Sequence, residues 1–132
     1  MTRSEAIFHL AVVSGDLDQS EDFYTRLGCT RARRYGDRIT LNFFDHQVVC
    51  HLEPSSVDPE PKMYPRHFGM TFTNESDYES VLDGALMEGL PFFAEDSWRW
   101  QGRADQHRTF FLRDPSNNLL EFKWYPDSTM IY

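Results

Sequence analysis

Residues 8–12, FHLAV, and residues 67–72, HFGMTF, are two short apolar segments that each carry one histidine in a strand-like run. Each segment is followed by a helical pattern that ends at a glycine, and then by further strand-like segments. The order of these elements is the same in both halves of the chain. The sequence therefore predicts an α+β fold built from two repeated β-α-β-β-β units.

The first unit is predicted to cover residues 6–53. Its first strand spans residues 7–13, and Ser14 and Gly15 end it. Asp16 is a candidate N-cap with Gln19 three residues later, and apolar side chains continue at helical spacing up to Gly28. Alternating patterns predict three more strands at residues 29–35, 38–44 and 47–52.

The second unit is predicted to cover residues 67–125, after a linker at residues 54–66 whose four prolines are incompatible with an interior strand. A strand at residues 67–73 precedes a helix that ends near Gly89, with Ser76 and Glu79 as its capping box. A short strand at 91–94, a polar, tryptophan-containing excursion at 95–106, and strands at 109–113 and 119–125 complete the unit. Residues 126–132 form a tail, and both units together are expected to build one domain, residues 1–132, with a cup-shaped mixed sheet.

The charge of the chain excludes some classes of function. Thirteen Lys and Arg residues stand against 21 Asp and Glu residues, for a net charge of −8, which disfavours nucleic acid as a partner. No apolar stretch approaches the roughly 20 residues of a membrane-spanning helix. Residues 1–5 lack a signal pattern, so a cytoplasmic location is expected, with Cys29 and Cys50 as reduced core residues.

Polar side chains recur at matching points of the two units. His9 in the first strand matches His67, 58 residues later, and His51 and Glu121 lie in the last strand of each unit. Burying an imidazole or a carboxylate is costly unless a partner compensates, and one divalent metal would compensate several of them. We therefore expect His9, His67 and Glu121 to bind a metal, with His51 either a fourth ligand or a neighbour. The alternative is that the histidines are satisfied core residues and that Glu121 pairs with Lys123.

Four segments, FHLAV, DLDQSEDFYTRLG, RHFGM and FFLRDPSNNLLEFK, resemble the vicinal oxygen chelate superfamily over residues 8–125. This superfamily includes glyoxalase I, fosfomycin-resistance enzymes, bleomycin-resistance proteins and extradiol dioxygenases. The last segment is similar to the family pattern F-x-x-DP-x-G-x-x-x-E, with Asn117 or Asn118 in place of the glycine. NFFDHQVVCHL and LLEFKWY are most similar to a small single-domain group described as predicted extradiol-type dioxygenases.

The resemblance implies a metal at His9, His67 and Glu121, and it places His51 where glyoxalase I has a fourth ligand that is normally acidic. It favours a dioxygenase that cleaves a small vicinal diol or enol chelated to Fe(II), with Mn, Ni or Zn as alternatives. His51 and His107 are candidate proton acceptors. The alternatives are a glyoxalase-like isomerase or an epoxide-opening transferase at the same site, or a metal-free protein that binds a small molecule.

The excursion at residues 95–106 is expected to form a wall of the substrate pocket, because indole and guanidinium groups suit a flat anionic or enolic ligand. The candidate substrate-binding residues are Trp98, Trp100, Arg103, Arg108, Tyr64 and Asn42. The alternative is a solvated loop. A homodimer is expected because two such units leave sheet edges to cover, and the metal site forms either within one chain or across two.

Overall fold

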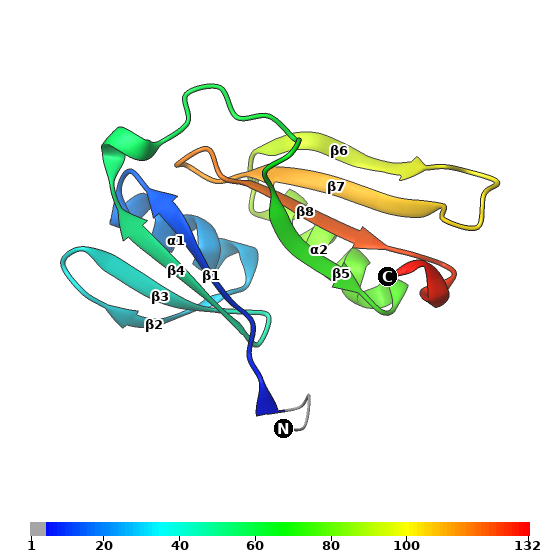
Figure 1. The fold of residues 1–132 in the computed structure, drawn as a ribbon, viewed down its shortest axis with the longest axis horizontal. Helices are drawn as coiled ribbons and strands as arrows, with labels where there is room; N and C mark the ends of the chain where they lie inside the picture. The colour runs from blue at the N-terminus through cyan, green and yellow to red at the C-terminus, as the bar shows by residue number, and fades with distance from the viewer. Residues whose placement is uncertain (1–4) are drawn as a thin grey trace.

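The structure of the protein is a computed structural model that describes residues 5–132. Residues 1–4, part of the segment in which no signal sequence is expected, lie outside the described residues. Within residues 5–132, eight strands form two four-stranded sheets, each with one helix of its unit (Figure 1). The predicted pair of β-α-β-β-β units is confirmed.

The two units have the same topology. Unit one contains β1 (His9–Ser14), α1 (Leu17–Leu27), β2 (Thr30–Arg34), β3 (Arg38–Phe43) and β4 (His46–Leu52), with sheet order β1-β4-β3-β2. Unit two contains β5 (Phe68–Phe72), α2 (Glu75–Met87), β6 (Phe92–Arg99), β7 (His107–Arg113) and β8 (Leu119–Trp124), with sheet order β5-β8-β7-β6. In each unit the first strand pairs in parallel with the last strand, and the other pairs are antiparallel.

The first helix begins and ends as its sequence predicts. The Asp16 side chain accepts a hydrogen bond from the backbone amide of Gln19, and Gly28 ends the helix in the left-handed region at φ 112°. The capping box predicted for the second helix is wrong. Asn74 is the N-cap, because its side-chain oxygen accepts from the amide of Asp77, and the Ser76 hydroxyl donates to that same oxygen.

One hydrophobic core joins the two units. Phe43 of unit one lies 5.6 Å from Phe68 and 6.4 Å from Phe122 between ring centroids, and α1 contacts α2. In the view of Figure 1 both sheets lie in front of the two helices. Each sheet therefore packs one face into the shared core and keeps a second face that no helix of the chain covers.

The polar excursion predicted at residues 95–106 is largely wrong. Strand β6 continues to Arg99, and only residues 100–106 form the turn before β7, starting with Trp100 at φ 56°. The register shifts between Phe92 and Ala94 and again between Ala94 and Ser97. These irregularities, at the edge of the sheet, break the alternation by which a strand is recognised in a sequence.

The two cysteines are buried and unpaired in unit one, as predicted. Across residues 5–132 there is no helix with the length and apolar character needed to cross a bilayer.

Candidate functional site

His67 and Glu121 face each other on the sheet of unit two. Nε2 of His67 lies 3.2 Å from Oε1 of Glu121, and the two side chains are 23% and 9% exposed. They meet because Glu121 lies in β8, which pairs with β5, and His67 immediately precedes β5. Tertiary structure thus joins two of the three predicted metal ligands.

Hydrogen bonds orient both groups. Nδ1 of His67 lies 2.6 Å from the carbonyl oxygen of Met63, and because a carbonyl only accepts, Nδ1 carries the proton. Oε2 of Glu121 accepts from the Thr109 hydroxyl at 2.6 Å. The atoms left over, Nε2 and Oε1, are the two that face each other. This arrangement, with the second atom of each ligand held by a neighbour, is typical of metal sites.

Gly69 permits the close approach of the two strands at this point. It is the register partner of Glu121, and a Cβ atom at Gly69 would overlap the carbonyl group of Glu121. Any side chain there would push β5 away from β8. Gly69 therefore helps to set the spacing between His67 and Glu121.

His9, the third predicted ligand, lies apart from this pair. It is an exposed residue of unit one, and its Nδ1 lies 2.6 Å from Oε1 of Gln47. Over residues 5–132 no three His, Cys, Asp or Glu side chains come close enough together to bind a metal ion. A single chain therefore does not assemble the predicted set of three ligands.

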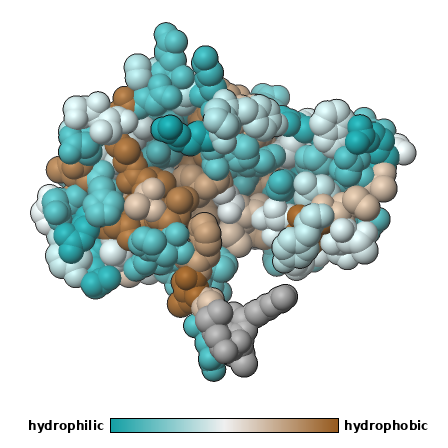
Figure 2. Space-filling view, viewed as in Figure 1, coloured by the Kyte–Doolittle hydropathy of each residue, from teal (hydrophilic) through white to brown (hydrophobic). Residues whose placement is uncertain are grey.

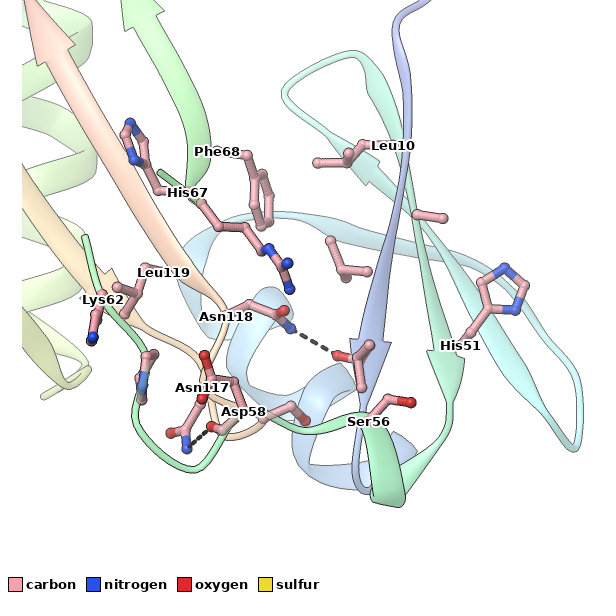
Figure 3. Close-up of a pocket in the computed structure, with 16 residues that line it drawn as sticks. Leu10, His51, Ser56, Asp58, Lys62, His67, Phe68, Asn117, Asn118 and Leu119 are labelled. Atoms are coloured by element: carbon pink, nitrogen blue, oxygen red, sulfur yellow. Dashed lines mark hydrogen bonds between the residues drawn. The ribbon is translucent and has the colours of Figure 1, made fainter. Parts of the chain in front are cut away.

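His51 shares the helix-free face of sheet one with His9. His51 of β4 pairs in register with Val13 of β1. Val13 and His9 are four residues apart on β1 and therefore lie on one face, and a register partner lies on the same face as its own partner. His9 and His51 thus lie on one face of the sheet. Figure 3 shows β1 lying between His51 and His67. Within one chain His51 is exposed, and it lines the same pocket as His67.

Aromatic side chains surround His67. The ring centroid of Tyr64 lies 5.6 Å from that of His67, and the ring centroid of Phe111 lies 5.3 Å from it. The structure thus places Tyr64, a predicted substrate-binding residue, at the site. Sequence reasoning missed Phe111 and Thr109, whereas Arg99, which donates to the Tyr64 hydroxyl at 2.6 Å, lies in the stretch expected to form the pocket wall. Thr109 and Phe111 lie in the strand predicted at residues 109–113, and the alternation along that strand was the signal that they share a face.

His107, a predicted proton acceptor, lies on the same face of β7 as Thr109, the residue that binds Glu121. Its side chain is buried, and its ring centroid lies 4.7 Å from that of Tyr125. Nδ1 of His107 lies 3.0 Å from the carbonyl oxygen of Asp105, which assigns the proton to Nδ1. Nε2 is then available as an acceptor.

Arg108 and Trp98 lie on the other face of this sheet, turned toward α2. Arg108 donates to Asp96 at 2.8 Å, Glu79 at 2.9 Å and Glu75 at 3.3 Å, and these hydrogen bonds raise the pKa of its guanidinium. Trp98, the register partner of Arg108, packs against Trp124 with ring centroids 6.1 Å apart. Both residues are thus engaged away from the His67–Glu121 pair.

Of the three other predicted substrate-binding residues, two lie in a turn and one lies in β3. Trp100 and Arg103 belong to the β6–β7 turn, where Arg103 stacks over the Trp100 ring at 5.1 Å and pairs with Asp105. Asn42 lies in unit one and accepts a hydrogen bond from the amide of Asp45. Their contacts in the single chain are local, and none is with His67 or Glu121.

A pocket of about 430 Å³ lies between the two units, and His67 is one of its lining residues (Figure 3). The turn between β7 and β8 closes one end of this pocket. There Asn118 donates to the carbonyl of Val13 and Asn117 donates to that of Asp58, each at 2.8 Å. These bonds tie unit two to β1 and to the linker.

A family model described as the glyoxalase/bleomycin resistance protein/dioxygenase superfamily matches residues 6–122. The chain is similar to a crystal structure of a glyoxalase/bleomycin resistance protein/dioxygenase from Alicyclobacillus acidocaldarius, with 51% identity, full coverage of both chains and a TM-score of 0.96. It is 28% identical over 127 residues to a glyoxalase domain-containing protein, RDO1, of Mycosarcoma maydis, covering 91% of this chain and 68% of that protein. The fosfomycin resistance protein FosX of Listeria monocytogenes shares the fold, with a TM-score of 0.71 at 12% identity, over 96% of this chain and 98% of that chain.

Proposed function

Since the chain belongs to the glyoxalase/bleomycin resistance protein/dioxygenase superfamily, whose members are often enzymes and commonly bind divalent metals, we propose that it is a metal-dependent enzyme. His67 and Glu121 supply two ligands. The reaction we propose is oxygen-dependent cleavage of a small vicinal diol or enol, with Fe(II) as the metal.

The facing pair of Nε2 and Oε1 is the observation that carries this proposal. With one proton of His67 on Nδ1, Nε2 faces Oε1 of Glu121 at 3.2 Å in a half-buried position. Either a second proton on Nε2 or a cation against both atoms satisfies this pair, and the proposal takes the cation. An imidazole and a carboxylate suit Fe(II), Mn(II), Ni(II) or Zn(II), and two histidines with one carboxylate are typical of non-haem Fe(II) oxygenases.

A second copy of the chain supplies the third ligand in this proposal. His9 is exposed on the helix-free face of unit one, next to Ile7 and Phe8, which are 67% and 65% exposed. Figure 2 shows a hydrophobic band over β1 and β4 on this face. Exposed apolar surface of this kind favours association, and a homodimer that covers it brings His9 of one chain to the His67–Glu121 pair of the other.

The residues of the chain have separate tasks in the reaction. His67 and Glu121 would hold a divalent cation, whose charge would lower the pKa of a substrate hydroxyl. Nε2 of His107 accepts the released proton, and His51, which shares the face of His9, is a second candidate acceptor. The exposed ring of Tyr64 binds the flat body of the substrate, and the buried ring of Phe111 packs against His67.

Metal content tests the ligand assignment. Protein purified without oxygen is expected to contain one metal ion per chain by elemental analysis. His67→Ala and Glu121→Ala should each lose this ion, whereas Glu95→Ala, an exposed carboxylate of β6, should retain it. Metal content unchanged in both ligand variants would contradict the assignment.

Oxygen uptake tests the reaction. The Fe(II)-loaded protein should consume O2 with catechols or related enediols, and His107→Ala should slow this reaction without removing the metal. Turnover without O2 in the presence of Mn, Ni or Zn would instead identify an isomerase or an epoxide-opening transferase at the same ligands.

A further inference from the structure

Arg99 presents a guanidinium beside the His67–Glu121 pair without an acidic partner. We infer that Arg99 binds an anionic head group of the substrate, a carboxylate or a phosphonate, while the body of the substrate lies against His67. This inference rests on the proposed function for its location and adds the chemical class of the substrate.

The guanidinium of Arg99 is held in place by neutral groups. Arg99 ends β6 opposite His107, and its Nη1 donates to the Tyr64 hydroxyl at 2.6 Å. Its Nη2 lies 3.5 Å from the sulfur of Met63, and its Cζ lies 5.9 Å from the centroid of the Phe111 ring. In the described part of the chain, no Asp or Glu oxygen lies within 4.0 Å of its nitrogens.

Arg99 and His67 share two neighbours. Tyr64 and Phe111 each contact the imidazole of His67 and also the guanidinium of Arg99. The two side chains therefore lie on one face of sheet two, around the same pair of rings. A small molecule bound against the exposed ring of Tyr64 would contact Arg99 at one end and His67 at the other.

Six of the nine other arginines of residues 5–132 pair with carboxylates, whereas Arg33, Arg66 and Arg113 do not. Arg108 is neutralised by three carboxylates, Arg103 by Asp105, and Arg34 by Asp18 and Glu21. In a chain with a net charge of −8, an orientated and half-buried guanidinium left without a carboxylate has unused capacity to bind an anion. Partial burial strengthens such a charge-assisted hydrogen bond.

The geometry also limits the size and shape of the ligand. Tyr64, which is 59% exposed, offers a ring surface, so the part of the substrate between the anion and the metal ligands is apolar and flat. Benzoate has this shape, and benzamide is its neutral counterpart of nearly the same size. These two molecules separate recognition of charge from recognition of the ring.

Isothermal titration calorimetry of the metal-free protein, which measures the dissociation constants of benzoate and of benzamide, tests the inference. Wild-type protein should prefer benzoate, and Arg99→Gln should weaken benzoate binding about ten-fold or more while leaving benzamide unaffected. Arg99→Lys should retain part of the preference because the charge remains. Arg31→Gln is the matched control, since Arg31 pairs with Glu21 of α1 on the other unit. Phenylphosphonate, titrated in parallel, shows whether a planar or a tetrahedral anion fits better.

The inference is overturned if the wild-type protein binds neither anion or binds benzamide as well as benzoate, or if Arg99→Gln keeps the preference. Thermal unfolding of each variant shows whether the fold is intact, which separates anion recognition from a purely structural bond to Tyr64. Failure of the metal proposal is visible separately, because metal content is measured on His67→Ala and anion preference is measured without metal.

Discussion

Thr109 shows how single residues set the chemistry of this site. Its hydroxyl binds one oxygen of Glu121 and leaves the other oxygen facing His67, while the carbonyl of Met63 does the same for the imidazole. The ligand types were evident from the sequence because buried polar side chains in apolar strands are costly. Their hydrogen-bond partners were not, since Thr109 lies 12 residues from Glu121 and meets it through strand pairing.

Thr109→Val should weaken metal binding by about 10- to 100-fold, because it removes the hydrogen bond that orients Glu121. A metal titration against a competing chelator measures this change. Thr40→Val, a buried threonine of the other sheet, should leave metal affinity near that of the wild type. Equal affinities for all three proteins would show that Thr109 does not position the ligand.

The two cysteines should be unreactive in the native protein. Burial raises the pKa of the Cys29 thiol and of the Cys50 thiol to about 12. At pH 8 only about one thiol in ten thousand is ionised, whereas an unfolded cysteine with a pKa of about 8.5 is substantially ionised. A thiol reagent at pH 8 should therefore label the protein rapidly only after denaturation.

Because the pKa of each thiol is higher in the folded protein than in the unfolded protein, these two groups make the free energy of unfolding fall as pH rises from about 8.5 toward 12. Rapid labelling of the native protein at pH 8 would contradict this burial.

At the scale of elements, the parallel pair β5–β8 determines the site. It aligns Gly69 with Glu121 and brings the residue before β5 against the carboxylate. The same pairing of β1 with β4 in unit one aligns His9 with Gln47. The repeat was predictable from the order of patterns, but the face of each strand in unit two was not, because β6 contains two register shifts.

Gly69→Ala should reduce the free energy of unfolding by at least about 3 kcal/mol, since the added Cβ overlaps the backbone of Glu121. Denaturant unfolding measures this loss. Gly36→Ala is the control, because a Cβ there meets nothing within 4 Å, and its effect should stay within about 0.5 kcal/mol. Similar stabilities for the two variants would mean that β5 and β8 are less tightly apposed.

At the scale of the whole molecule, the two units bury their helix-facing sides in one core, and no helix of the described residues covers the opposite sheet faces. His9 lies on one of these faces and the His67–Glu121 pair lies on the other sheet. The proposed site is therefore complete only when two chains combine their faces.

Mixing two inactive variants tests this arrangement. His9→Ala and Glu121→Ala proteins each lack one ligand in every site, so each alone should bind little metal. After subunit exchange, half of the dimers are mixed and each mixed dimer has one intact site, so about a quarter of the wild-type sites should return. Recovery of metal binding on mixing, measured by elemental analysis, requires ligands from two chains. No recovery after verified exchange would place all ligands of a site within one chain.

The sequence alone determined the order of elements, the two-unit repeat and the residue types of the candidate metal ligands, because periodicity and the cost of burying polar groups are local properties. Only the tertiary structure decided that Arg99 lies beside His67 while Arg108 is neutralised against α2, and that His9 lies apart from Glu121. Register shifts reverse which side chains share a face, and packing of the units sets distances between residues far apart in the chain. Neither is encoded in a local pattern of residues.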